Sequence, residues 1–138
     1  MAKYTFDGIT FDSKLEADHY KILKAHPHIK VVNDHQTFEL YPKHSFLHFP
    51  RLKKTHQQPI RYTPDFILHV DGLDKPVAME SKGYARKEYM LRKKLFMLKY
   101  SREFYFYQCK SVKQLKDDLE KLKGELKWTT DTEFTAES

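Results

Sequence analysis

Two short runs in the middle of the chain decide the fold: RYTPDFILHV at residues 61–70 and AMESKGY at residues 78–84. Both runs are largely apolar, as expected for strands of a buried sheet. They nevertheless contain three charged side chains, Asp65, Glu80 and Lys82. Charged groups are rare inside a sheet unless they are paired or bind a ligand, so these residues are the first candidates for a functional site.

The turn between the two runs predicts how they pair. A hairpin centred on Gly72 and Leu73 places Asp65 directly opposite Glu80, and the Cβ atoms of opposed residues are about 4.5–5.5 Å apart. Lys82 lies on the same face as Glu80, because side chains along a strand repeat every two residues. The sequence therefore predicts that the three charges converge on one patch of the sheet.

Two opposed carboxylates repel each other, so this patch needs a compensating positive charge. One interpretation is a structural ion pair with Lys82. The other is a divalent cation, for which oxygen ligands favour Mg²⁺ or Mn²⁺ over zinc. Such an ion would polarise a phosphate and generate hydroxide from water, while Lys82 would position that water or stabilise the developing charge. The spacing alone leaves both interpretations open.

The charge balance of the chain indicates the kind of partner. The 138 residues carry a formal net charge of +6. We expect a single domain over residues 1–128 and an acidic, flexible tail over residues 129–138. The tail holds three acidic residues and no basic one, so residues 1–128 carry +9. This excess favours a polyanionic partner, with nucleic acid ahead of a membrane surface.

Other features of the sequence favour a cytoplasmic protein over a membrane or secreted one. No apolar run approaches the roughly 20 residues of a membrane-spanning helix, and the N-terminal residues lack the apolar stretch of a secretory signal. Cys109 is the only cysteine, so an intrachain disulfide is excluded and a reducing compartment fits best. We therefore expect a cytoplasmic protein without a membrane partner.

The pattern of apolar residues and turn signals predicts a mixed α/β fold in which helices flank a central mixed sheet, in the order α-β-β-β-α-β. Within residues 60–70 the strict alternation predicts one continuous strand, with Tyr62 and Phe66 on the same face. The expected elements are a hairpin at 4–11, a helix at 13–26, one or two strands at 29–41, a hairpin within 42–60, strands at 60–70 and 76–82, a helix at 86–101, a strand at 103–109 and a helix from 111.

Glu16 has two possible roles. It follows Ser13 by three residues, which is the capping-box spacing that opens a helix. The first helix would also bring this carboxylate toward the patch as a further acidic group. The sequence leaves open whether Glu16 is a capping residue, a site residue or both.

The order of Glu16 on a helix, then Pro64-Asp65, then Glu80-Ser81-Lys82 resembles the PD-(D/E)xK nuclease superfamily. The wider stretch from FDGITFDSKLEADHY through YTPDF, MESKGY and EYMLRKKLF is similar to a small phage-encoded family of that superfamily. The resemblance covers roughly residues 3–109. It implies a restriction-endonuclease-like core and a metal-dependent DNA endonuclease, often a Holliday junction resolvase, in phage recombination or DNA processing; its location would then be the host cytoplasm.

The resemblance also implies a role for each motif residue. Asp65 and Glu80 correspond to the ligands of a Mg²⁺ or Mn²⁺ ion, and the backbone carbonyl of Ser81 would complete the metal shell. Lys82 corresponds to the catalytic lysine, and Glu16 to the helix acid found in many members. Paired nicks across a four-way junction need two active sites, and one small domain supplies one, so we expect a homodimer.

Two basic segments are candidates for contact with DNA phosphates. One is the helix at 86–101, whose sequence predicts one basic and one apolar face. The other is the stretch from Leu40 to Pro64, which contains no acidic residue and would form a finger reaching a groove or branch. The alternatives are an ordinary solvated helix face and a flexible basic loop. The predicted DNA-binding residues are Arg51, Lys53, Lys54, Arg61, Arg86, Lys87, Lys93 and Lys94.

Two other functions remain possible from the sequence. One is a DNA-binding module that keeps the fold and does not cleave, although the presence of Asp65, Glu80 and Lys82 favours cleavage. The other is a sequence-specific nuclease of the restriction type. A chain of 138 residues leaves little room for dedicated base-reading elements, and neither basic segment contains a base-reading motif, which favours recognition of DNA shape.

Overall fold

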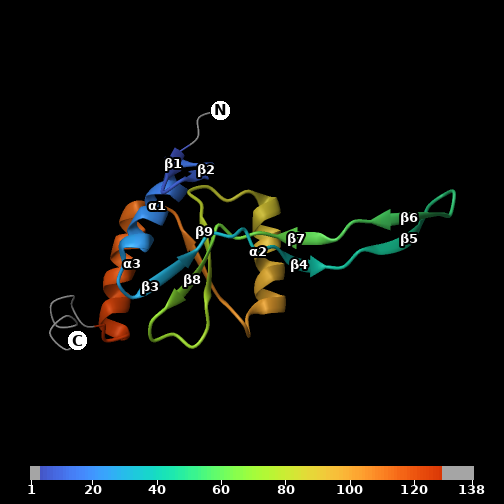
Figure 1. Ribbon diagram of the computed structural model, residues 1–138. Coiled ribbons are helices and arrows are strands. Elements are labelled where there is room, and N and C mark those ends of the chain that lie inside the picture. Colours follow the sequence, from blue (N-terminus) through green and yellow to red (C-terminus); the bar gives the residue numbers. More distant parts are fainter. Residues whose placement is uncertain (1–3, 129–138) are drawn as a thin grey trace.

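The computed structural model describes residues 4–128, with three helices and ten strands in this range (Figure 1). The predicted acidic tail at 129–138 lies outside the described residues. In chain order the elements are β1 (Tyr4–Phe6), β2 (Ile9–Phe11), α1 (Lys14–Ala25), β3 (Ile29–Val32), β4 (Phe38–Tyr41), β5 (His44–His48), β6 (Lys53–Gln57), β7 (Ile60–Tyr62), β8 (Phe66–Val70), β9 (Val77–Ser81), α2 (Lys87–Tyr100), β10 (Tyr105–Cys109) and α3 (Val112–Glu125).

The centre of the molecule is a four-stranded mixed sheet in the order β10-β9-β8-β3. Strands β9 and β10 are parallel, and the other neighbours are antiparallel. If only the strands of this sheet are counted, the chain runs α1-β3-β8-β9-α2-β10 before it ends in α3. The predicted mixed α/β class and the order α-β-β-β-α-β are therefore confirmed.

Helices cover both faces of the sheet, with α1 and α3 on one side and α2 on the other (Figure 1). Alternate residues of β8 divide between the two cores, because neighbouring side chains on a strand point to opposite faces. Phe66 and Leu68 pack in the core beneath α1 and α3. Ile67 packs with Phe96 of α2. The three-layer arrangement explains why β8 and β9 are apolar along almost their whole length.

The predicted register of the β8–β9 hairpin is confirmed. Phe66 pairs with Met79, and the pairing continues to Leu68 and Val77. Asp65 and Glu80 lie one step beyond the pair of Phe66 and Met79, at the end of the hairpin remote from its turn. The connection between the paired segments is longer than a two-residue turn, because the pairing of β8 with β9 ends at Leu68 and Val77.

The prediction of one continuous strand over residues 60–70 is wrong. Residues 63–65 separate β7 from β8, and β7 pairs with β4 outside the central sheet. The break also changes the face on which side chains lie, since Tyr62 packs with Ile67 and not with Phe66. Pro64 accounts for the break, because proline has no N–H to donate to a neighbouring strand.

The predicted starts of the first and last helices are confirmed. Ser13 caps α1, and its hydroxyl accepts a hydrogen bond from the backbone N–H of Glu16 at 3.1 Å. Ser111 caps α3 in the same way through the N–H of Gln114, at 3.0 Å. These side chains satisfy backbone donors that have no partner within the helix. None of the helices in residues 4–128 is both long and apolar enough to cross a membrane.

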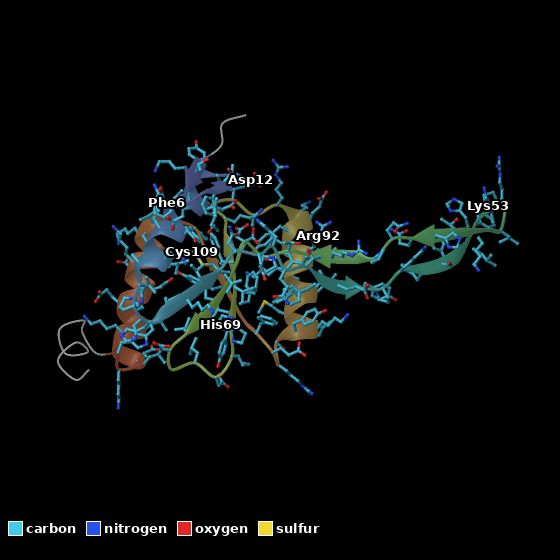
Figure 2. The ribbon with its side chains drawn as sticks, viewed as in Figure 1. Phe6, Asp12, Lys53, His69, Arg92 and Cys109 are labelled. Atoms are coloured by element: carbon cyan, nitrogen blue, oxygen red, sulfur yellow. The ribbon has the colours of Figure 1, made fainter. Side chains whose placement is uncertain are left out.

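The predicted hairpin within residues 42–60 is confirmed as β5 and β6. It continues the paired strands β4 and β7 into a narrow two-stranded ribbon that projects from the body of the molecule on the side of α2 (Figure 1). Lys53 lies near the far end of this ribbon (Figure 2). We refer to residues 38–62 as the ribbon.

Candidate functional site

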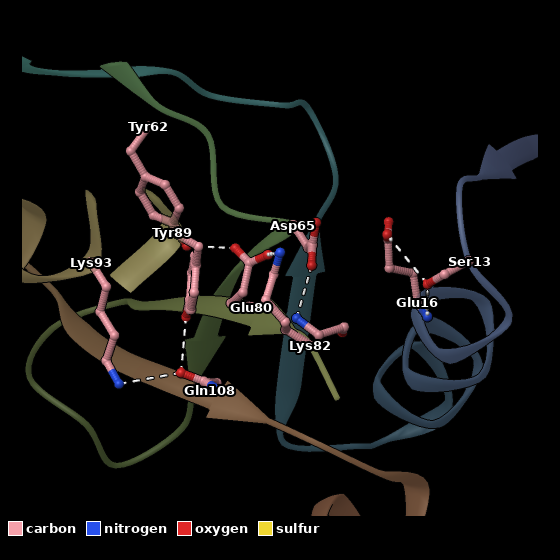
Figure 3. Close-up of polar contacts among 10 residues, drawn as sticks. Ser13, Glu16, Tyr62, Asp65, Glu80, Lys82, Tyr89, Lys93 and Gln108 are labelled. Carbon is pink, nitrogen blue, oxygen red and sulfur yellow. Dashed lines mark hydrogen bonds and ion pairs between the residues drawn. The ribbon is translucent and has the colours of Figure 1, made fainter. Parts of the chain in front are cut away.

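Asp65 and Glu80 meet at the end of the β8–β9 hairpin, where the strand register brings them together (Figure 3). One carboxylate oxygen of Asp65 accepts a hydrogen bond from the backbone N–H of Ser81 at 2.8 Å. The Glu80 side chain is almost completely buried, and its Oε1 accepts a hydrogen bond from the Tyr62 hydroxyl at 2.6 Å. The predicted convergence of the two carboxylates therefore occurs in a largely dry environment.

Burial and mutual repulsion change the protonation of this pair. Burial, with the neighbouring Glu80 as the next cause, raises the pKa of Asp65 to about 7. Burial also raises the pKa of Glu80, although the hydrogen bond from Tyr62 and the charge of Lys82 oppose the change. Two acids that ionise reluctantly are the expected result when negative charge is concentrated away from water without full compensation.

Lys82 supplies only part of that compensation. Its Nζ atom lies 3.9 Å from Oε2 of Glu80, which is longer than a hydrogen bond, and about a third of its side chain is exposed. The same amine lies 4.8 Å from the centre of the Tyr89 ring, where a cation is attracted to the aromatic face. The lysine is thus held between Glu80 and Tyr89 with its amine at the edge of the site.

Glu16 takes part in the cap of α1 and lies in the electrostatic field of Asp65. Its backbone N–H bonds to the capping residue Ser13, and its carboxylate accepts a longer hydrogen bond from the Ser13 hydroxyl at 3.4 Å. Burial raises the pKa of the Glu16 carboxyl to about 7, and the charges of Asp65 and Asp12 add to the effect. Helix α1 therefore brings a third acid into the electrostatic field of the site (Figure 3).

The donor set fits a hard divalent cation, with one restriction. The predicted ligands, the carboxylates of Asp65 and Glu80 and the carbonyl of Ser81, are all oxygen atoms, as Mg²⁺ and Mn²⁺ prefer. Among residues 4–128, no group of three or more His, Cys, Asp or Glu side chains is arranged to hold a metal ion. In this conformation Glu16 is therefore an electrostatic neighbour of the pair and not a third carboxylate ligand.

Two tyrosines that the sequence analysis did not select belong to the site. Tyr62 bonds Glu80, and Tyr89 lies under Lys82. The Tyr89 hydroxyl donates to Oε1 of Gln108 at 3.0 Å, and Nζ of Lys93 donates to the same atom at 3.2 Å. These bonds join α2 to β10 and hold the Tyr89 ring beside Lys82 (Figure 3). No local sequence signal marks these residues, because their partners are 15 to 19 positions away.

His19 is a further residue that sequence reasoning missed. It is completely buried, with Nδ1 2.7 Å from the Ser81 hydroxyl and Nε2 3.0 Å from the carbonyl oxygen of Ser111. A carbonyl only accepts, so Nε2 carries the proton, and Nδ1 must accept from Ser81. Burial lowers the pKa of the ring. A neutral histidine thus joins α1, the middle residue of Glu80-Ser81-Lys82 and the start of α3.

The predicted DNA-binding residues divide into two groups. On α2 and at its start the exposed members are Arg86, Lys87 and Lys94, whereas Lys93 is half-buried against Gln108. On the ribbon the members are all exposed, and they are Arg51, Lys53, Lys54 and Arg61. The structure therefore brings the predicted catalytic residues toward one end of the hairpin, and it distributes the predicted DNA-binding residues over helix α2 and the projecting ribbon.

Comparisons with known proteins identify one family. Neither the curated proteins nor the solved structures that were compared gave a match. The sequence profile of a family described as "Protein of unknown function (DUF1064)" matches residues 1–116, a range that contains every predicted catalytic and metal-binding residue. The chain belongs to this DUF1064 family.

Proposed function

We propose that the protein is a metal-dependent endonuclease of the PD-(D/E)xK type that hydrolyses phosphodiester bonds in branched DNA. One observation carries the proposal: half-buried Asp65 and buried Glu80 lie next to each other at the end of one hairpin, with Nζ of Lys82 3.9 Å from Oε2 of Glu80. A purely structural pair would be expected to be better neutralised, because buried charges without full compensation cost free energy.

In the proposed site, Asp65, Glu80 and the Ser81 carbonyl hold a Mg²⁺ or Mn²⁺ ion. The ion supplies Lewis-acid chemistry to the scissile phosphate. The amine of Lys82 lies beside Glu80 at the edge of the site, where it stabilises negative charge that develops on the phosphate. Glu16 lies close enough to Asp65 for their charges to interact, and it orients water at the site.

The α-β-β-β-α-β order of the central sheet and its helices supports a restriction-endonuclease-like core. The exposed cations of α2 and of the ribbon are proposed to bind phosphates on either side of the scissile bond. A homodimer would bring two such sites to one four-way junction. Recognition would then depend on DNA shape, because the phosphate contacts carry no base sequence.

The proposal is tested with end-labelled duplex, flap and four-way junction DNA, incubated with the protein in Mg²⁺, in Mn²⁺ or in EDTA. We expect cleavage of the junction in either metal, slower cleavage of the duplex and none in EDTA. Asp65→Asn and Glu80→Gln should remove cleavage while the protein keeps its fold by circular dichroism.

The same experiment separates the alternatives. Metal-dependent cleavage of the duplex at a fixed sequence, with no preference for the junction, would favour a restriction-type nuclease. Binding of every DNA form without cleavage in either metal would favour the non-cleaving module. Cleavage that persists in EDTA or in Asp65→Asn would remove the proposed role of the carboxylate pair.

A further inference from the structure

Among the described elements, the two strands of the outer half of the ribbon, β5 and β6, pair only with each other and make no extensive contact with the body of the molecule. Every residue of β5 is exposed, and so are all residues of β6 except Thr55. An isolated two-stranded hairpin is at best marginally stable in water. Because nearly all side chains of β5 and β6 are exposed, they contribute little to the stability of the fold. A binding partner better explains which residues occur there.

One face of this hairpin carries a row of rings. Side chains at alternate positions share a face, so His44, Phe46 and His48 line the same side of β5. The ring centres of His44 and Phe46 are 6.4 Å apart, and those of Phe46 and His48 are 6.3 Å apart. Tyr41 continues the row toward the body, 5.3 Å from His44. We call these four residues the ring ladder.

The ring ladder is exposed to solvent and surrounded by positive charge. Phe46 is 44% exposed and Tyr41 is 50% exposed. Lys53 lies opposite His48 in the strand register, on the same face. An open hollow of about 700 Å³ at the end of the ribbon is lined in part by Arg51, Lys53 and Lys54. No acidic residue occurs between Leu40 and Pro64, so nothing in this segment offsets its positive charge.

We propose that the ring ladder binds unpaired nucleotides, whose bases stack on its rings while their phosphates contact Lys53 and Arg51 at the end of the ribbon. Single strands without a preferred sequence are bound by this combination of aromatic rings and cationic surface. A buried duplex base offers no face for stacking. The inference also gives the proposed nuclease a substrate class, which is DNA with unpaired bases at or beside a branch point. This part of the inference rests on the proposed function.

The ribbon also connects the ring ladder to the candidate site. Strand β7 returns from the hairpin and ends at Tyr62, whose hydroxyl bonds Glu80. A strand rises about 3.3 Å per residue, so the nine steps from Lys53 to Tyr62 span about 30 Å. A single strand of DNA that lies along the ribbon would therefore lead toward Asp65 and Glu80.

The test measures binding of the full chain to fluorescein-labelled (dT)15 and to a 15-base-pair duplex by anisotropy in EDTA, so that cleavage cannot interfere. The variants are Phe46→Ala, Phe46→Leu and Phe46→Trp, with Leu47→Ala as the matched control. Leu47 precedes His48 on the same strand, is 64% exposed, and lies on the face opposite the ring ladder. None of these substitutions changes the charge of the ribbon.

We expect Phe46→Ala and Phe46→Leu to weaken binding to (dT)15 by about tenfold, which is the usual loss for one stacked base. Phe46→Trp should retain binding, Leu47→Ala should change it less than about twofold, and duplex binding should be unaffected by all four. Equal losses for Phe46→Ala and Leu47→Ala, or wild-type binding by Phe46→Leu, would overturn the stacking role.

Two further outcomes distinguish base stacking from nuclease activity and from dimerisation. If wild-type protein binds (dT)15 through Phe46 but cleaves no DNA in any metal, the nuclease proposal fails and the stacking surface remains. If the wild-type protein is a dimer by sedimentation and Phe46→Ala makes it a monomer without changing (dT)15 affinity, the ring ladder is an interface between two copies, and the inference is overturned.

Discussion

The Asp65 carboxyl group links stability to pH at the scale of a single residue. Its pKa rises from 3.8 to about 7 in the folded protein, so between these values the folded state binds more protons than the unfolded state. The free energy of unfolding must then fall as pH rises from about 4 to about 7. Glu16, with a pKa raised from 4.5 to about 7, acts in the same direction.

Asp65→Asn should remove this penalty. We expect the variant to melt a few degrees above the wild type at pH 8 without divalent metal, and to differ less at pH 4, where Asp65 is largely protonated in the folded state. The control is Asp34→Asn, which removes a carboxylate from an exposed position and should not raise the melting temperature at pH 8. A variant that is less stable at pH 8 would show that the carboxylate is a stabilising partner.

Addition of Mg²⁺ at pH 8 should raise the melting temperature of the wild type, because an ion that binds only the folded state stabilises it. The same addition should have no such effect on Asp65→Asn. Both melting temperatures are measured by calorimetry without DNA. Equal stabilisation of both proteins would mean that the metal binds elsewhere.

His19 is predicted to be a positioning residue, because its Nδ1 holds the Ser81 hydroxyl. His19→Asn keeps an acceptor near Nδ1, whereas His19→Gln keeps a donor near Nε2. Both should lose about 1–3 kcal/mol of stability through the changed core, but only His19→Gln should strongly reduce kcat. Equal kcat values, measured well below the melting temperatures, would limit His19 to a structural role.

The pH dependence gives a second test of His19. Its pKa is lowered from 6.5, so the unfolded state takes up a proton that the folded state resists. Stability contributed by the neutral ring is present above pH 6.5 and is lost as pH falls below that value. Either variant should show a smaller loss of stability between pH 7 and pH 5 than the wild type does.

Glu16→Gln tests whether the helix acid acts in catalysis. The amide still accepts from Ser13, and the backbone bond that caps α1 is unchanged, so we expect a melting temperature close to that of the wild type at pH 5. Cleavage should fall by about 100-fold, a typical loss for a residue that handles protons or water. Wild-type cleavage by this variant would leave Glu16 with the helix cap alone.

At the scale of the residue, the sequence predicts contacts that depend only on the register of one hairpin. Asp65, Glu80 and Lys82 are brought together by one hairpin, so counting from its turn is enough. The partners Tyr62 and His19 depend on packing between separate elements. His19 contacts residues 62 and 92 positions away, a separation that periodicity cannot span.

At the scale of the element, alternation is a reliable guide only where pairing is continuous. Residues 60–70 alternate strictly, and yet Pro64 ends the pairing and assigns β7 and β8 to different sheets. Helix α2 differs from expectation in a similar way. The sequence predicts one basic and one apolar face, but apolar side chains are buried at Tyr89 and Phe96 and exposed at Leu91 and Leu98.

The contacts of α2 distinguish two neighbouring lysines. Lys94 is exposed, whereas Lys93 bonds Gln108 beside Tyr89. Lys94→Ala should weaken binding to all DNA forms and reduce the salt slope by about one unit, with no change in melting temperature. Lys93→Ala should lower the melting temperature and kcat as well. Identical effects of the two changes in a gel shift series and in calorimetry would contradict the separate roles.

For the whole molecule, the order of helices and sheet strands follows from patterns that lie within each element and from the positions of glycine and proline. For the ribbon, the sequence predicts a hairpin but not that the hairpin projects from the body. The projection arises because none of the other described elements makes extensive contact with β5 and β6. The ribbon projects on the side of the sheet that α2 covers (Figure 1), and Tyr62 of the core beneath α2 bonds Glu80. The ribbon and the carboxylate pair therefore lie on connected parts of the molecule, which suits a ligand that extends beyond Asp65 and Glu80.

Single-turnover cleavage of a labelled four-way junction in Mg²⁺ by Lys82→Ala tests the central claim most directly. Lys82 contributes to no core cluster, so the variant should fold and bind the junction as the wild type does. We predict that cleavage falls at least 100-fold, as for loss of one charge-stabilising group. Lys30→Ala, which changes an exposed lysine on the edge strand β3, should cleave normally. Wild-type cleavage by Lys82→Ala would contradict the assigned role of this lysine and with it the nuclease site.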